Sequence, residues 1–304
     1  MMKKIQFVLL YIFISLTEKT FAYPISPRPL RQLVIESESI VIGYVVKTYN
    51  KNKEGADWFR NMAKIVILEK LQGSIKDDTI EIIFYPGMIC PAPEIYYDST
   101  LVISFIDEFD GSYYTHAHSY GAKTLTKEEI AIYKNRIQEI QKIQKIANKE
   151  EQLTNTVDWL VKCAEIETTR WEGIFELMPE SDFMSIFSID KNQNFSKLLT
   201  EEQRERLKKA LLKTKEINYR EFGLVDLLYK GNKSEIEDFL IIRLKDLKED
   251  NYWFADEYFN RLKHRSKSES VKLILEQFES IEFKNRYRKE IRKIIEDFLI
   301  LVEA

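Results

Sequence analysis

The hydrophobic and polar positions along the chain follow two different periods. Up to about residue 124, short runs rich in Ile, Val, Tyr and Phe alternate with turn residues, which is typical of β-strands. Beyond that point, apolar residues recur every three or four positions, which is typical of amphipathic helices. A β module is therefore expected to precede an all-α module. One helical stripe consists of Ile130, Tyr133, Ile137 and Ile140.

The distribution of glycine and proline supports the same division. Six of the nine Gly and six of the seven Pro precede Thr124, and the 180 residues after it contain only Pro179 and three Gly. Helix interiors exclude both residue types, whereas turns between strands use them. The sequence thus predicts a two-domain α+β fold. Its parts are a small five-stranded OB-like β-barrel over residues 23–124, a connecting helix over 125–149, and an all-α helical-repeat domain, an α-solenoid, over 150–304.

Five strands are predicted in the β module, after a short helical stretch at Leu30–Glu38. Between the last two strands, Asp110-Gly111 favours a type I′ hairpin turn, because both central positions of that turn need positive φ. Gly43 inside the first strand indicates a bulge or sharp bend. Five curved strands with a bent first strand suit a small closed barrel. The predicted strands are Ile40–Tyr49, Ala63–Leu71, Thr79–Tyr85, Thr100–Ile106 and Ser112–Ser119.

The helical half shows clear helix starts and a repeat. In a capping box, a Ser or Thr and a Glu or Gln three positions later satisfy free N–H groups at a helix N-terminus. Thr200, Ser234 and Ser268 are spaced 34 residues apart, and each opens a helix that a second helix follows. Such pairs predict an α-solenoid that resembles divergent HEAT-type repeats, with an irregular helical bundle as the alternative. The predicted capping boxes are Thr126–Glu129, Thr169–Glu172, Thr200–Gln203 and Ser234–Glu237.

Residues 1–22 have the layout of a secretory signal peptide. Lys3 and Lys4 give a positive start, an unbroken apolar run follows, and a small-x-small cleavage site ends at Ala22. The apolar run of about 12 residues is shorter than the roughly 20 needed to span a bilayer, and an uncleaved anchor is the alternative. We expect an exported protein, periplasmic or secreted, that begins at Tyr23 and has no integral membrane segment in its mature chain.

Two segments of the β module carry a family resemblance. Residues 37–46 read SESIVIGYVV, and residues 63–73 read AKIVILEKLQG. They resemble the first two strands of the netrin-like barrel found in tissue inhibitors of metalloproteinases, and the resemblance, over roughly residues 36–124, implies an OB-type barrel. In those inhibitors an N-terminal Cys, held by a disulfide, binds the catalytic zinc of the protease. Cys90 lies where the partner of that Cys would be, but the predicted mature chain begins at Tyr23, so the resemblance does not imply metalloprotease inhibition.

The charge distribution argues against nucleic-acid binding. Residues 23–124 carry 10 basic and 13 acidic side chains, and residues 125–304 carry 33 and 35. A nucleic-acid interface needs a clustered basic footprint that neutralises phosphates, and neither half has one. The expected partner is therefore an unknown protein or peptide.

Two groups of residues have spacings that could bind a metal. His116 and His118 alternate on a predicted strand, so their side chains would share a face, as zinc chelation requires; an exposed hairpin face is the favoured interpretation. A second group has the spacing of an EF-hand loop, but Phe195 stands where that loop needs Gly, which favours an ordinary polar loop. No metal or other cofactor is expected. The EF-hand-like positions are Asp190, Asn192, Asn194 and Glu201.

The cysteines and the known catalytic motifs indicate no active site. Cys90 and Cys163 lie in different modules and could form a disulfide in an oxidising compartment, or remain two buried thiols. Cys163 also lies in a segment, residues 159–172, that is dense in Trp and Arg, where packing is favoured over a binding role. No P-loop, hydrolase or zinc-protease motif occurs, and three His leave few general bases.

These observations predict an exported, non-enzymatic binding protein. Its partner would contact the helical-repeat surface and the loops of the barrel. An inhibitor of an extracellular hydrolase is one alternative, and a hydrolase with carboxylate catalysis is another. The hydrolase would need a concave pocket with two convergent Asp or Glu side chains.

Export is directly testable. We expect cleavage between Ala22 and Tyr23, because a positive start, an apolar run and a small-x-small site precede that bond. N-terminal sequencing of protein recovered from the extracellular or periplasmic fraction should therefore begin at Tyr23. Recovery of intact Met1 in a membrane fraction would contradict this expectation.

Overall fold

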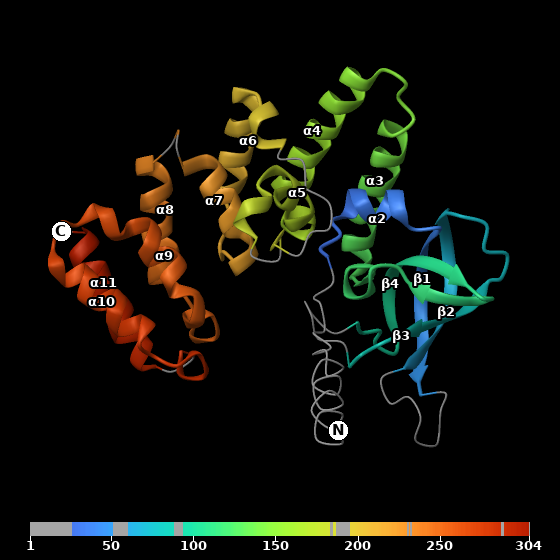
Figure 1. Cartoon of the computed structure of the whole chain (residues 1–304), viewed down its shortest axis with the longest axis horizontal. Coiled ribbons are helices and arrows are strands. Elements are labelled where there is room, and N and C mark those ends of the chain that lie inside the picture. Colours follow the sequence, from blue (N-terminus) through green and yellow to red (C-terminus); the bar gives the residue numbers. More distant parts are fainter. Residues whose placement is uncertain are drawn as a thin grey trace, which may run out of the picture.

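The computed structural model describes residues 26–50, 60–87, 94–182, 185–186, 195–229, 231, 233–286 and 289–303. Within them, a β-barrel is followed by a helical region (Figure 1). The predicted signal peptide and its cleavage site lie outside these residues. Among the described helices, none is both long and apolar enough to cross a membrane.

The N-terminal part is a closed five-stranded barrel. β1 pairs antiparallel with both β2 and β4, so the order β1-β2-β3-β5-β4 returns to β1. β3 and β5 run parallel to each other. This is the OB-like barrel that the sequence predicts. The strands are β1 Ser39–Tyr49, β2 Asn61–Gln72, β3 Thr79–Phe84, β4 Thr100–Phe109 and β5 Ser112–Thr115. A further short strand, β6 Ala122–Thr124, pairs antiparallel with residues 102–104 of β4.

Two glycines shape the barrel as predicted. At Gly43 the pairing of β1 with β2 shifts register, and a Cβ on this residue would lie 2.3 Å from Ile65 Cγ2. Only Gly allows this close approach of the two strands. Asp110 and Gly111 both have positive φ, 50° and 66°, and connect β4 to β5. The predicted bulge and hairpin turn are therefore confirmed.

β1 separates two apolar cores. Because side chains alternate along a strand, Val41 and Val45 point into the barrel, whereas Ile40 and Ile42 point outward. All four side chains are buried. The inward pair belongs to the core of the barrel interior, and the outward pair belongs to the core that the barrel shares with the helices. Both faces of β1 are therefore covered by apolar side chains, one inside the barrel and one at its contact with the helices.

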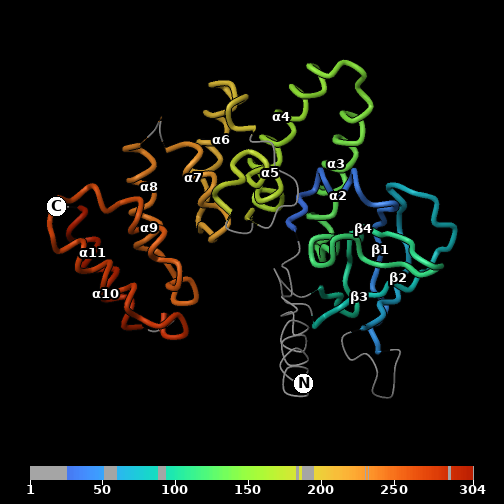
Figure 2. Tube along the Cα trace, viewed as in Figure 1, coloured from blue at the N-terminus to red at the C-terminus, as the bar shows by residue number. Residues whose placement is uncertain are grey.

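The helical region starts against the barrel and continues as an arc. α2 (Leu30–Glu36) packs on α3 (Lys127–Ile143) beside the barrel (Figure 1). From α4 onward the helices follow one another to the C-terminus at the far end of the arc (Figure 2). α6, α8 and α10 each pair with the helix that follows. The remaining helices are α4 Lys149–Glu165, α5 Arg170–Leu177, α6 Glu201–Leu212, α7 Phe222–Tyr229, α8 Lys233–Lys245, α9 Ala255–Leu262, α10 Glu269–Glu279 and α11 Glu290–Glu303.

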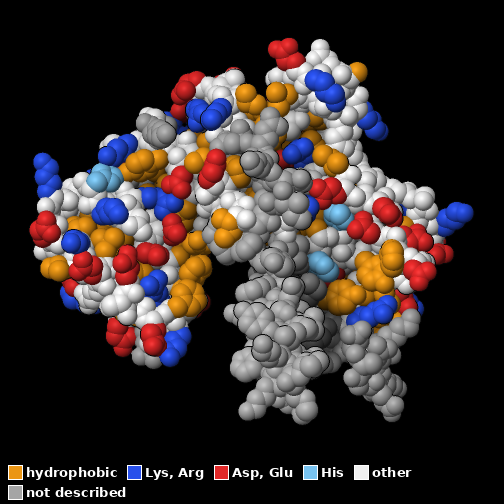
Figure 3. Space-filling model, in the orientation of Figure 1, with side chains coloured by type: hydrophobic (Ala, Val, Ile, Leu, Met, Phe, Trp, Pro, Cys, Tyr) orange, Lys and Arg blue, Asp and Glu red, His pale blue; other side chains and the backbone are white. Residues whose placement is uncertain are grey.

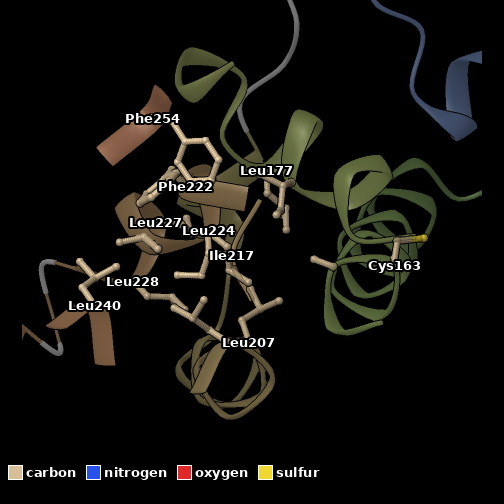
Figure 4. Packing of buried hydrophobic residues seen from close by; sticks show 14 of the residues in the cluster. Cys163, Leu177, Leu207, Ile217, Phe222, Leu224, Leu227, Leu228, Leu240 and Phe254 are labelled. Atoms are coloured by element: carbon tan, nitrogen blue, oxygen red, sulfur yellow. The ribbon is translucent and has the colours of Figure 1, made fainter. Parts of the chain in front are cut away.

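One apolar core runs through the helical region. Figure 4 shows side chains of successive helices pointing toward one another, with Ile217 and Leu224 between Leu207 and Phe222. The Phe222 ring meets the Tyr258 ring edge to face, with centroids 5.0 Å apart. The same cluster extends from Leu30 of α2 to Val302 of α11. Each helix pair therefore buries its apolar face against its neighbours, as a repeat architecture requires.

Two of the four predicted capping boxes are confirmed and two are wrong. Thr126 and Thr200 cap α3 and α6, where each side chain accepts a hydrogen bond from the backbone N–H three residues later. In both helices the side chain at that later position accepts a hydrogen bond from the N–H of the Thr. Thr169 makes no cap bond with its side chain, and α8 begins before Ser234. Burial explains both failures. Glu172 and Glu237, which would complete the two boxes, are 2% and 5% exposed. Their carboxylates bond to groups outside the first turns of their own helices.

A buried carboxylate ties the barrel to the helices. Glu172 of α5 accepts a hydrogen bond from the Leu30 N–H, which lies 2.7 Å from its Oε2. Its Oε1 accepts from Lys123 Nζ of β6 at 2.7 Å and from the Tyr133 hydroxyl of α3 at 3.0 Å. The Leu30 N–H is a first-turn donor of α2 that has no partner within its own helix. A single side chain therefore joins α2, α3, α5 and β6.

A second carboxylate docks α2 on α5. Glu176 lies four residues after Glu172, so both side chains project from the same face of α5. Its carboxylate accepts hydrogen bonds from the Arg31 guanidinium, with Nε at 2.7 Å. Burial raises the pKa of the Glu176 carboxyl, and the charge of Arg31 opposes that rise. The ion pair keeps α2 against the helical region.

Replacing Glu172 by alanine should destabilise the whole chain. The change leaves Lys123 half-buried without its partner, and the cost of breaking a buried ion pair is about 3–5 kcal/mol. Urea unfolding followed by circular dichroism measures the loss in the free energy of unfolding. Glu139→Ala is the matched control, because Glu139 is 40% exposed beside Arg136, and we expect a loss of at most about 1 kcal/mol. Equal losses in the two variants would contradict the role of Glu172.

Candidate functional site

Short 3-10 turns lead into the second helices of successive pairs, and an aromatic side chain accompanies each turn. Trp171 follows η2, at the start of α5. Tyr219 opens the turn before α7, Trp253 lies in the turn before α9, and Phe283 opens the turn before α11. At the barrel, the turn after β5 supplies Tyr120. The turns are η1 His118–Tyr120, η2 Glu167–Thr169, η6 Tyr219–Glu221, η7 Glu249–Phe254 and η9 Phe283–Asn285.

These five side chains line up across the molecule. The rings of Tyr120 and Trp171 are stacked, 5.6 Å apart and 14° from parallel. The Tyr219 and Trp253 ring centroids are 5.2 Å apart, and those of Trp253 and Phe283 are 5.8 Å apart. Arg220, the residue after Tyr219 in the chain, contacts the first of these groups, because its guanidinium carbon lies 5.6 Å from the Trp171 ring centre. We call Tyr120, Trp171, Tyr219, Trp253 and Phe283 the aromatic row.

The aromatic row changes from buried to exposed along its length. Tyr120 is 6% exposed, the three residues in the middle are half-buried, and Phe283 is 57% exposed. Figure 3 shows hydrophobic side chains gathered on the edge of the C-terminal helices that faces the barrel. A partly exposed apolar strip of this kind marks an interaction surface more often than a single exposed residue does.

Polar contacts hold the centre of the row in place. Trp171 Nε1 donates a hydrogen bond to Asp182 Oδ2 at 2.9 Å, which orients the indole ring. The pKa of Tyr219 is raised, chiefly by burial and further by the carboxylates of Glu257 and Asp182. The Tyr219 hydroxyl therefore stays neutral at physiological pH. The two rings present fixed, uncharged faces.

Arg220 adds a positive charge to this surface. The side chain is exposed and stacks on the Trp171 ring. Among the described residues, no acceptor lies within hydrogen-bond distance of its guanidinium, since only its backbone N–H is bonded, to Asn218. Stacking occupies the face of a guanidinium and leaves the N–H groups at its edge free, a geometry that matches a carboxylate. The row can therefore bind apolar groups and an anion side by side.

The segment 159–172 contributes both packing and the row. Trp159 is 1% exposed and donates from Nε1 to the Arg136 carbonyl at 3.0 Å. Arg170 is also buried and pairs with Glu221 at 2.8 Å. The predicted packing role is confirmed for these two residues. Trp171, the residue after Arg170, is only half-buried and belongs to the aromatic row.

The two histidines do not share a strand face, so that prediction is wrong. β5 ends at Thr115, and His118 has a φ of 51°, a left-handed conformation that turns the chain. His116 Nδ1 lies 2.7 Å from Asp107 Oδ2, whereas His118 Nδ1 lies 3.3 Å from Glu94 Oε2. Each imidazole is thus held by a different carboxylate of the barrel.

The EF-hand-like positions are not brought together in the part of the chain that the structure describes. Glu201 is the exposed first residue of α6. Asp190, Asn192 and Asn194 lie outside the described residues. Within those residues, no three His, Cys, Asp or Glu side chains form a group that could hold a metal ion.

Cys163 lies in the last turn of α4, and it forms no disulfide with any residue that the structure describes. It is fully buried, and burial raises the pKa of the thiol well above its usual range. A thiol of this kind is a poor nucleophile, because the thiolate is the reactive form. Cys90 lies outside the described residues, so its pairing with Cys163 stays a prediction.

Sequence reasoning missed most of the aromatic row. Its helical residues are separated by 48, 34 and 30 positions, so only Tyr219 and Trp253 share the register of the 34-residue repeat. The available signal was an aromatic residue just before or at the start of each second helix. Recognising it required the order of the helix pairs in space.

Comparison with models of known protein families and with curated proteins gives no match. The fold and the aromatic row therefore carry the functional interpretation.

The exposed end of the row should contribute little to folding. Phe283→Ala removes a ring that is 57% exposed, whereas Phe278→Ala empties a fully buried site five residues earlier. We expect a loss of about 3–5 kcal/mol for the buried ring and about 1 kcal/mol or less for Phe283. Urea unfolding of both variants measures this difference. A loss at Phe283 as large as that at Phe278 would assign the row to the core.

Proposed function

We propose that the chain is a binding protein that recognises a short segment of a partner protein along the aromatic row. The observation that carries the proposal is the contact of aromatic rings from successive helix pairs, ending in the exposed Phe283. Aromatic residues are the commonest anchors of protein interfaces, because they bury a large area at low entropic cost.

The dimensions of the row suit an extended peptide. The Tyr219 and Trp253 ring centroids are 5.2 Å apart and those of Trp253 and Phe283 are 5.8 Å apart. These three rings therefore cover at most about 11 Å, the length of about three residues of extended chain. Helical repeats use such surfaces, because each repeat adds one contact position. An apolar side chain of the partner would rest on Trp253 and Phe283.

The positive charge of Arg220, in the middle of the row, selects the partner further. Among the described residues, no acceptor takes a hydrogen bond from the Arg220 guanidinium, which lies beside Trp171. A carboxylate of the partner can accept two parallel hydrogen bonds from its edge. The preferred segment therefore carries an acidic group about three residues from an apolar side chain.

Localisation and ancestry are part of the same proposal. The layout of residues 1–22 supports export after Ala22. The strand order supports a netrin-like barrel without the zinc-binding N-terminal Cys, and the consecutive helix pairs support divergent HEAT-type repeats. An exported protein would meet its partner outside the cytoplasm.

Selection from a random peptide library displayed on phage tests the binding function. Peptides selected on the full chain should combine an acidic and an apolar residue, and their binding should change the fluorescence of Trp171 and Trp253. Phe283→Ala and Arg220→Ala should each weaken binding by about tenfold, since interface anchors contribute more than 1 kcal/mol.

Leu273→Ala is the matched control. Leu273 is 63% exposed on α10 and does not belong to the row, so its removal should leave peptide affinity unchanged. Circular dichroism confirms that each variant is folded. Selected peptides that bind all three variants as tightly as the original chain would refute recognition by the row.

A further inference from the structure

A cavity of about 530 Å³ lies where α2 meets the hairpin of α3 and α4. Its walls come from α2, the end of α3, the start of α4 and the turn η5, Phe195–Leu198. This volume lies within the range of pockets that bind small molecules, and such pockets favour boundaries between modules. The cavity shares no residue with the aromatic row, so the two sites are independent.

One side of the cavity is apolar. Ile140 is 1% exposed and Phe195 is 3% exposed, so both form a closed wall. Leu153 of α4 and Ile143 of α3 are partly buried beside them, and Ile35 of α2 is 52% exposed at the cavity. An aliphatic chain would remove this surface from water at no polar cost.

The other side offers donors that have no acceptor. Gln144 Nε2 is buried and has no hydrogen-bond partner among the residues that the structure describes. Lys149 Nζ donates a hydrogen bond to Gln152 Oε1 at 3.2 Å. In the part of the chain that the structure describes, it has no other side-chain hydrogen bond, and no carboxylate lies within ion-pair distance of it. Arg31, which also lines the cavity, is neutralised by Glu176. Among the described residues, this side therefore offers one ammonium without a carboxylate partner and one amide nitrogen without an acceptor.

We propose that this cavity binds an aliphatic monocarboxylate, with its tail on the apolar wall and its carboxylate between Gln144 and Lys149. A buried donor without an acceptor is costly, and a ligand oxygen removes that cost. The ammonium of Lys149 distinguishes an anionic head from a neutral one. The ligand class is therefore a medium-chain fatty acid or a molecule of the same chemistry.

Calorimetric titration of the full chain with decanoate, below its micelle concentration, tests the proposal. Decanoate should bind, and decanol should bind at least tenfold more weakly because it lacks the charge. Lys149→Glu should weaken decanoate by tenfold or more. Lys145→Glu, the same charge reversal at an exposed lysine that does not line the cavity, should leave the affinity unchanged.

Filling the cavity gives a second, charge-independent test. Leu153→Trp should abolish decanoate binding, whereas Leu273→Trp, at an exposed position outside the cavity, should not change it. Circular dichroism of each variant reports whether it is folded. If Leu153→Trp fails to fold, the pair Lys149→Glu and Lys145→Glu decides. Absence of decanoate binding, or equal binding by Lys149→Glu and Lys145→Glu, would overturn the proposal.

Discussion

The buried carboxylate of Glu172 is the interaction on which the arrangement of the two modules depends. A charge removed from water is tolerated only when donors replace its hydration. Here the donors come from Leu30, Lys123 and Tyr133, so they belong to α2, β6 and α3. Neither module satisfies this group alone. The need of the buried Glu172 carboxylate for hydrogen-bond donors therefore fixes the position of the barrel against the helices.

The same requirement positions both proposed binding sites. Glu172 directly follows Trp171, so holding α5 in place also holds the indole ring against Tyr120 of the barrel. Glu176, one turn further along α5, anchors Arg31 of α2 at the wall of the cavity. Any shift of α2 against α5 would change that wall and the start of the row together.

The helical pairs separate stability from recognition. Their apolar stripes close a continuous core, while the turns that join the two helices of a pair carry the row at its edge. Phe278 and Phe283 show the division, since one ring is fully buried and the other is mostly exposed five residues later. Because each pair adds a turn as well as a core layer, the proposed recognition surface can extend without loss of core packing.

The sequence by itself determined the features that depend on neighbouring residues. The strand and helix periods, the bend at Gly43, the turn at Asp110 and the cap at Thr126 all arise from local backbone chemistry, and the structure has them where the pattern predicts. Only the tertiary structure decided the role of Glu172, because burial brought it donors from distant parts of the chain in place of its expected cap. The same holds for the aromatic row and the cavity, whose side chains meet only after the helix pairs have packed.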